Sequence, residues 1–263
     1  MDTRKRTEQM RKKQCWYLIL FLIIIAICIS IGVVIYHYEH TFMWFNNGLP
    51  TPEEVATWDE HKLRNTLFRL SRWESFINGA QFNKLVNRQI RPLAKKSSDK
   101  FHFLEVGMGV GAFSREILRM FPHSTGVGID IAPATIEIAK VVLPSDRMTV
   151  MVGDMQHIAS RGSEFHVIFV PGALCLLLSM DHVHSAVAEF HRLLKPGGGI
   201  CISLIPSEIS NTGACNTRIP KKFWSEDIVY KYGFIVLALE EMDDWHLPHS
   251  NGRYSVCLQK PAS

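Results

Sequence analysis

The chain has 263 residues, of which 47% are hydrophobic and 21% charged, and its formal net charge is +4. Much of the positive charge lies near the N-terminus and no long basic stripe follows, so we expect no nucleic-acid partner. The six cysteines form neither a CxxC pair nor a Cys/His ligand spacing. We therefore expect no metal site and no disulfide framework.

An apolar run follows a basic tail of residues 1–14. The segment 16–36 would rise about 31 Å as a helix, which matches a hydrocarbon core of about 30 Å. A cleaved signal peptide is the alternative, but the run is longer than an ordinary h-region and no small-x-small cleavage site follows it. The sequence predicts a transmembrane helix over 15–38 in a single-pass protein of the endoplasmic reticulum or another endomembrane.

The side of the membrane on which the large domain lies stays open. Six basic residues precede the run, and the nearest basic residue after it is Lys62. The positive-inside rule then places the N-terminus in the cytoplasm and the large domain across the membrane. The absence of an Asn-x-Ser/Thr sequon and of a paired-cysteine pattern favours the opposite arrangement.

Residues 39–99 are predicted to form a linker and a helical segment. Thr51 and Pro52 have the chemistry of a helix start, and two acids follow in the first turn. We expect one helix from Pro52 to about Leu70 and a second over about 71–90. The pair could either pack on the domain or form a lid over a ligand pocket.

From residue 100 to 263, strand and helix patterns alternate, which favours a parallel sheet covered by helices. The expected strands are 101–106, 124–130, 147–152, 165–170, 200–205, 234–240 and 254–259, and the expected helices are 112–120, 133–142, 181–194 and 222–232. The last two strands have no helix between them and should pair antiparallel.

A glycine-rich turn, which includes Gly107, Gly109 and Gly111, joins the first of these strands to a helix. Acids lie at the ends of successive strands, where a ligand would meet the turn. Asp130 could accept both hydroxyls of a ribose and Asp154 an adenine amino group, while Glu105 could act on a cationic part of the ligand. Each acid alone is more often a solvated carboxylate or a helix cap.

Residues 107–112 also fit the dinucleotide fingerprint, so the turn alone does not identify the cofactor. The segment 105–111 (EVGMGVG) resembles the first motif of class I S-adenosylmethionine-dependent methyltransferases. The segments 127–133 (VGIDIAP), 153–155 (GDM) and 193–198 (LLKPGG) resemble their second-strand motif, their adenine motif and their turn before strand five. The resemblance covers about residues 101–260.

This resemblance implies a doubly wound, mostly parallel, seven-stranded Rossmann-like sheet in which the last strand inserts beside strand five. It also implies S-adenosylmethionine as the cofactor. The cofactor-binding residues it implies are Glu105, Gly107, Gly109, Gly111, Asp130, Ile131, Asp154, Met155 and Val170. The chain departs from the family at Phe165-His166, where many members have Phe-Asp, and we interpret His166 as structural.

The methyl acceptor is not fixed by the sequence, although an N-terminal anchor favours a small or lipophilic molecule. Asp243, Trp245 and His246 are weak catalytic candidates in the connection between the last two strands, which could equally be a solvated loop. Two alternatives remain: a membrane-anchored, inactive methyltransferase-like binding protein, and an NAD-dependent oxidoreductase. The latter lacks a Tyr-x-x-x-Lys pair after the fourth strand.

Overall fold

The computed structural model describes residues 49–59, 61–63, 86–92, 100–207, 215–241 and 252–262. The chain divides into the units 1–48 and 49–263, and all described residues belong to the second. The predicted basic tail and the predicted transmembrane helix over 15–38 lie outside the described residues. Within the part that is described, no helix has the length and apolar character needed to cross a bilayer.

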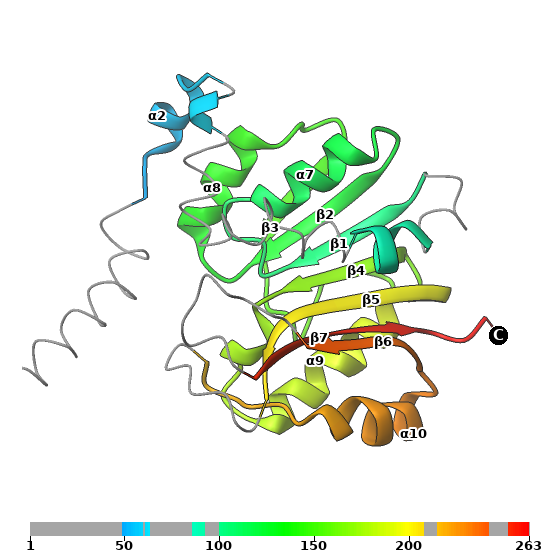
Figure 1. Cartoon of the computed structure of the whole chain (residues 1–263). Helices are drawn as coiled ribbons and strands as arrows, with labels where there is room; N and C mark the ends of the chain where they lie inside the picture. The colour runs from blue at the N-terminus through cyan, green and yellow to red at the C-terminus, as the bar shows by residue number, and fades with distance from the viewer. Residues whose placement is uncertain are drawn as a thin grey trace, which may run out of the picture. The chain divides into compact units, whose positions relative to one another are not determined.

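The described strands form one sheet in the order β3-β2-β1-β4-β5-β7-β6 (Figure 1). Strands β1 to β5 run parallel, and β7 pairs antiparallel with both β5 and β6. The predicted topology, with the last strand inserted beside strand five, is confirmed. The strands are β1 (His102–Val106), β2 (Thr125–Asp130), β3 (Met148–Val152), β4 (Phe165–Pro171), β5 (Leu194–Pro206), β6 (Ile235–Glu241) and β7 (Arg253–Gln259).

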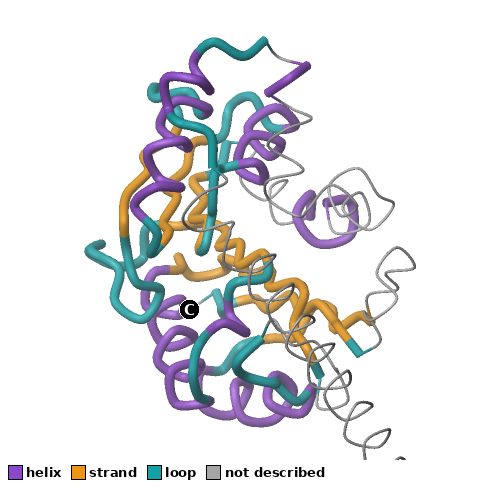
Figure 2. Tube along the Cα trace, turned by 90° about the vertical axis from the view of Figure 1, so that its left-hand side faces the viewer, coloured by secondary structure: helices purple, strands orange, loops and turns teal. Residues whose placement is uncertain are grey.

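Helices cover both faces of the sheet, so the central strands are apolar on both sides. The helices α7 (Ala112–Met120) and α8 (Pro133–Val142) share one core cluster with Phe103 and Phe169. The helix α9 (Met180–Leu193) packs on the opposite face. In Figure 2 the strands cross the middle of the domain, with helices above and below them.

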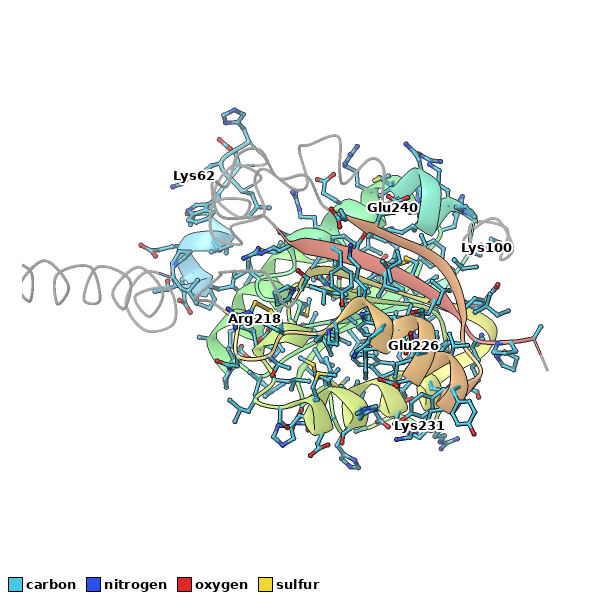
Figure 3. The ribbon with its side chains drawn as sticks, turned by 60° about the horizontal axis from the view of Figure 1, so that its bottom comes forward. Lys62, Lys100, Arg218, Glu226, Lys231 and Glu240 are labelled. Atoms are coloured by element: carbon cyan, nitrogen blue, oxygen red, sulfur yellow. A yellow bond between two sulfur atoms is a disulfide. The ribbon has the colours of Figure 1, made fainter. Side chains whose placement is uncertain are left out.

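The segment after the β5 loop is amphipathic and covers the same face as α9. It consists of a π-helical stretch, η3 (Phe223–Ile228), and the short helix α10 (Val229–Tyr232). Its residues Phe223, Trp224 and Ile228 are buried. Glu226 and Lys231 lie at the surface of the segment (Figure 3).

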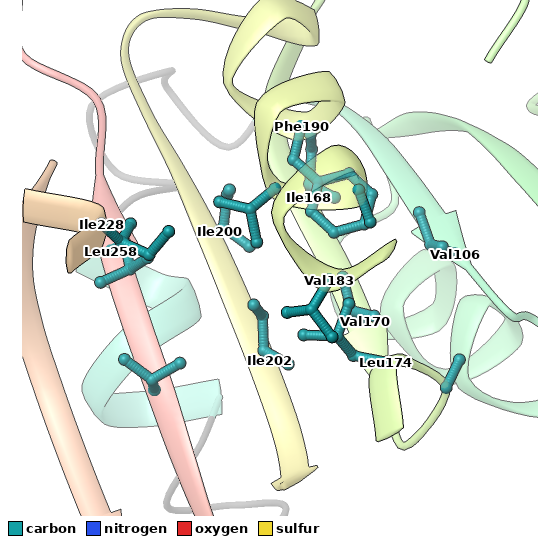
Figure 4. Packing of buried hydrophobic residues seen from close by; sticks show 14 of the residues in the cluster. Val106, Ile168, Val170, Leu174, Val183, Phe190, Ile200, Ile202, Ile228 and Leu258 are labelled. Atoms are coloured by element: carbon teal, nitrogen blue, oxygen red, sulfur yellow. The ribbon is translucent and has the colours of Figure 1, made fainter. Parts of the chain in front are cut away.

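The packing under α9 explains why β4 and β5 hold their places. Figure 4 shows Phe190 beside Ile168, and Val183 beside Val170. All four side chains are fully buried. Burying an aliphatic or aromatic side chain of this size contributes about 1.5–3 kcal/mol. This core therefore holds β4 against α9.

The predicted helix from Pro52 to about Leu70 is wrong in its length. The helix α2 (Pro52–Ala56) begins as expected: Thr51 Oγ1 accepts the Glu54 N–H at 3.2 Å, and the Glu54 carboxylate accepts the Thr51 N–H at 2.9 Å. It ends after Ala56, and Asp59 Oδ1 accepts the Lys62 N–H at 2.7 Å, which starts a new helical turn at 61–63. Side-chain caps thus divide the segment. Of the second predicted helix, the structure describes only its end, including η1 (Val86–Ile90).

Strand β5 begins earlier than predicted and contains the Lys-Pro-Gly-Gly turn. Leu194 pairs with Phe165, and the next pair joins Gly199 to Val167. The residues 195–198 therefore form an insertion within the strand. Gly197 has a φ of 76°, a left-handed conformation that glycine adopts without steric cost.

The prediction of no disulfide framework is wrong. Cys175 is bonded to Cys215, and Cys201 is bonded to Cys257. The second pair joins residues that lie directly opposite each other in β5 and β7. Strand register, which no cysteine spacing reports, brings this pair together.

Candidate functional site

The site is built around the turn between β1 and α7. Gly107 and Gly111 have φ values of 69° and 83°, which favour glycine. The N–H groups of Gly107 and Met108 donate to the carbonyl of Ile129 at 2.9 and 3.0 Å. These bonds fold the turn over the end of β2 and bring it beside the acid that follows Ile129.

Gly109, at the tip of the turn, borders open space. Its φ is 54°, and a Cβ added there would meet nothing within 4 Å. Backbone that is open on one side can be approached closely by a ligand. The N-terminus of α7 follows directly, with Gly111 as its cap and no side chain bonded to its first N–H groups. The turn therefore fits the polar part of a nucleoside cofactor.

Asp130 joins the turn to the start of α8. Its Oδ2 accepts the Gly109 N–H at 2.7 Å, and its Oδ1 accepts the Ala132 N–H at 2.9 Å. A carboxylate oxygen has two acceptor positions, so each oxygen keeps one for a ligand hydroxyl. Beside it, the side chain of Ile131 is 74% exposed, which suits contact with a flat ring.

Asp154 is connected to Asp130 through the backbone, because the Gly153 N–H donates to the Asp130 carbonyl at 3.0 Å. Oδ1 of Asp154 accepts the Gln156 N–H at 2.9 Å, which holds the carboxylate in a turn. The side chain of Asp154 is exposed, and that of Met155 is partly buried against the core. The structure thus brings Asp130 and Asp154 to one edge of the sheet.

Glu105 lies under the turn and is only 1% exposed. Its carboxylate accepts the hydroxyl of Ser114 on α7. Burial raises the pKa of Glu105 to about 8, and the Ser114 hydrogen bonds oppose this rise. Glu105 therefore carries a proton at neutral pH in the domain as described.

The remaining predicted residues are Val170 and the three catalytic candidates. Val170 is fully buried in the core under α9, so only its backbone is available to a ligand. Asp243, Trp245 and His246 lie outside the described residues. Among those that are described, no group of three or more His, Cys, Asp or Glu side chains could hold a metal ion.

One residue of the site, Ala173, could not be identified from the sequence pattern. A Cβ added to Gly107 would lie 2.2 Å from the Cβ of Ala173, so the segment after β4 packs directly on the glycine turn. Cys175, two residues further on, is bonded to Cys215. These contacts depend on how two distant loops meet, and only the need for glycine at 107 is visible in the motif.

Comparisons with known proteins agree with this geometry. Residues 103–198 match the family model described as a methyltransferase domain. Over 85 residues the chain is 34% identical to malonyl-[acyl-carrier protein] O-methyltransferase 1 from Ilyobacter polytropus. That match covers 32% of this chain and 32% of the relative, so the chain spans about a third of the relative's length.

Solved structures share the fold. The PH0226 protein from Pyrococcus horikoshii OT3 has a TM-score of 0.52 and 18% identity, covering 74% of this chain and 98% of its own. CalS10, an amino pentose methyltransferase from Micromonospora echinaspora solved with S-adenosylmethionine bound, has a TM-score of 0.50 and 18% identity, covering 65% of this chain and 87% of its own. The family match supports a methyltransferase domain over residues 103–198, and the solved structures show that the fold is shared.

Proposed function

We propose that this chain transfers a methyl group from S-adenosylmethionine to a small or lipophilic acceptor while anchored to a membrane through residues 15–38. The observation that carries the cofactor site is the bond between Asp130 and Gly109. It ties the acid at the end of β2 to the tip of an open glycine turn, and this is the arrangement that a ribose requires.

The chain's own residues bind and orient the donor. Asp130 accepts the ribose hydroxyls, while Ile131, Asp154 and Met155 form the adenine side of the site. The backbone at Gly109 admits the amino-acid part. When bound, S-adenosylmethionine supplies an activated methyl group on a sulfonium, so alignment with the acceptor is the main requirement on the protein.

The nature of the acceptor rests on two observations. The curated relative is named for O-methylation of a malonyl group carried on a protein. The run over 16–36 has the length and composition of a membrane span, which favours an acceptor delivered from or near the bilayer. Asp243, Trp245 and His246 remain the candidates for the acceptor side, and the inactive binding protein remains the alternative function.

Calorimetric titration of the detergent-solubilised full chain with S-adenosylmethionine and with NAD tests the cofactor site. Asp130→Ala should weaken S-adenosylmethionine binding by about 1–3 kcal/mol, because ribose hydroxyls lose a charged acceptor. Asp227→Ala, at an exposed position on η3, is the matched control and should bind normally. Binding of NAD alone would reject the methyltransferase assignment.

The methyl acceptor, the membrane anchor and the side of the membrane need separate experiments. A screen of membrane extracts with methyl-labelled S-adenosylmethionine should reveal a labelled product, and the cofactor-site variant Asp130→Ala should lower the amount of label at limiting S-adenosylmethionine. Carbonate extraction of microsomes should leave the full chain in the membrane and release a variant without residues 1–38. Release of the full chain by carbonate would contradict the membrane anchor. Protease protection of the same microsomes measures on which side of the membrane the domain lies.

A further inference from the structure

Two loops at the carboxyl edge of the sheet are joined covalently and by hydrogen bonds. Cys175, in the segment after β4, is bonded to Cys215, in the segment after β5. The backbone N–H groups of Asn216 and Thr217 both donate to the Cys175 carbonyl, at 2.9 and 3.1 Å. The side chains of Asn216 and Thr217 donate to the two carbonyls that follow Cys175. We call the residues 172–178 and 215–217 the clasp.

One half of the clasp forms a wall of the cofactor site. Ala173 packs against Gly107 so closely that a Cβ on the glycine would lie 2.2 Å from the Cβ of Ala173. The Gly172 N–H also donates to the Ser203 carbonyl of β5, at 3.2 Å. A displacement of this segment would therefore change the shape of the glycine turn.

The other half of the clasp is fixed to the core. The Ile219 N–H donates to the Pro206 carbonyl at 3.0 Å. The Ile219 carbonyl accepts the hydroxyl of Tyr254, at 2.6 Å, and that hydroxyl accepts the Trp224 indole N–H, at 2.8 Å. Tyr254 and Trp224 are fully buried. The segment 215–219 is thus a rigid support to which the disulfide attaches the β4 loop.

The two disulfides differ in access to a reductant. Cys215 is partly exposed, and Arg218, three residues further along the chain, lies at the surface (Figure 3). Cys201 and Cys257 are 4% and 0% exposed within the β5–β7 ladder. Thiol–disulfide exchange requires a thiolate to reach a sulfur atom, so the Cys175–Cys215 disulfide should be reduced before the Cys201–Cys257 disulfide.

We propose that the Cys175–Cys215 disulfide is a redox-sensitive bond that closes the clasp and holds the β4 loop in the conformation that binds the cofactor. A dithiol reductant attacks the Sγ of Cys215 and breaks the sulfur–sulfur bond. Two electrons and two protons pass from the reductant to the cysteines, which become thiols, and the reductant leaves as a disulfide. The expected change in S-adenosylmethionine binding rests on the proposed function, whereas the expected change in the mobility of the β4 loop does not.

The experiment compares the full-length wild type with two double variants. Cys175→Ser/Cys215→Ser removes the disulfide of the clasp, and Cys201→Ser/Cys257→Ser removes the buried disulfide as a matched control. Each is measured with and without dithiothreitol by calorimetry with S-adenosylmethionine and by hydrogen exchange over 172–178. Peptide mapping under non-reducing conditions first establishes the Cys175–Cys215 pair in the wild type.

Reduction should weaken S-adenosylmethionine binding about tenfold in the wild type and in the control, as expected if the competent loop is then populated about a tenth of the time. Exchange over 172–178 should rise in the same samples, and the clasp variant should be weak and insensitive to reductant. Unchanged affinity and exchange after reduction, or absence of the Cys175–Cys215 peptide, overturns the clasp. If S-adenosylmethionine binds no form, the proposed function fails, and the exchange data still decide whether the clasp exists.

Discussion

The ring nitrogen Nδ1 of His166 accepts the backbone N–H of His102, at 3.1 Å, and so joins the start of β4 to the start of β1. His166 stands where many members of the family have aspartate, and the bond gives it the structural role that we expected. Only an unprotonated ring nitrogen can accept a hydrogen bond. Burial and the nearby Lys195 ammonium lower the pKa of His166, which keeps the ring neutral.

This bond predicts a loss of stability in mild acid. Since the folded-state pKa lies below the ordinary value of 6.5, the contribution of His166 is present above that value and is lost as pH falls toward the folded pKa. His166→Asn keeps an acceptor that does not titrate there. Urea unfolding at several pH values should show a shallower acid dependence for the variant, by about 0.5–1.5 kcal/mol, the range for one hydrogen bond.

The control for this measurement is His123→Asn, because His123 is exposed in the turn before β2. This variant should follow the wild-type pH profile. If His166→Asn follows it as well, the pKa of His166 is the same in the folded and unfolded states and the bond to His102 is not the acid-sensitive contact.

A second prediction concerns the buried Glu105, whose contribution to stability falls as the pH rises, whereas that of His166 falls as the pH drops. Burial raises the pKa of Glu105 to about 8 from an ordinary value of 4.5. Its contribution to stability is therefore fully present below pH 4.5 and is lost as pH rises through about 8. Relative to Glu105→Gln, the wild type should lose up to about 1.4 kcal/mol per pH unit within this window.

Ser114→Ala provides the second arm of this test. The Ser114 hydroxyl stabilises the ionised carboxylate, so its removal should move the alkaline transition to higher pH. Denaturant unfolding from below pH 4.5 to above pH 8 measures both variants. Parallel profiles for the wild type and Glu105→Gln would show that Glu105 is already ionised in the folded domain.

Two glycines of the same turn should differ in their tolerance of alanine. Both Gly107 and Gly109 have positive φ, which costs an L-residue about 1–2 kcal/mol. Only at Gly107 would the new methyl group collide, at 2.2 Å from the Ala173 Cβ, and overpacking of this kind costs about 1–3 kcal/mol more. The free energy of unfolding, measured in urea, should therefore be lower for Gly107→Ala than for Gly109→Ala. Equal losses of stability in the two variants would contradict the contact with Ala173.

The parts of the fold that follow from local patterns were predictable. The apolar run of β1, the positive-φ glycines and the acid at the end of β2 are each readable within a few residues, and parallel strands bring their ends together. The contact between Gly109 and Asp130 is therefore an expected consequence of the motif. The inserted last strand followed from the family resemblance and from the lack of a helix between the final strands.

The features that the sequence did not reveal all depend on distant segments. Cys201 meets Cys257 only because β5 and β7 pair in one particular register. The early start of β5 depends on the pairing of Leu194 with Phe165, after which residues 195–198 are left out of the register. Likewise, Ala173 becomes part of the site through a loop contact, and no periodicity in the chain encodes such a contact.

The last prediction concerns the support of the clasp. The Tyr254 hydroxyl satisfies two buried groups at once, the Trp224 indole N–H and the Ile219 carbonyl. Tyr254→Phe leaves both without this partner, and an unsatisfied buried polar group costs about 1–3 kcal/mol. Tyr230→Phe removes the same atom from a side chain that is 95% exposed and should change stability by no more than about 0.5 kcal/mol. Urea denaturation of the two variants measures the difference, and a loss at Tyr254 as small as that at Tyr230 would show that water or a local shift replaces the hydroxyl.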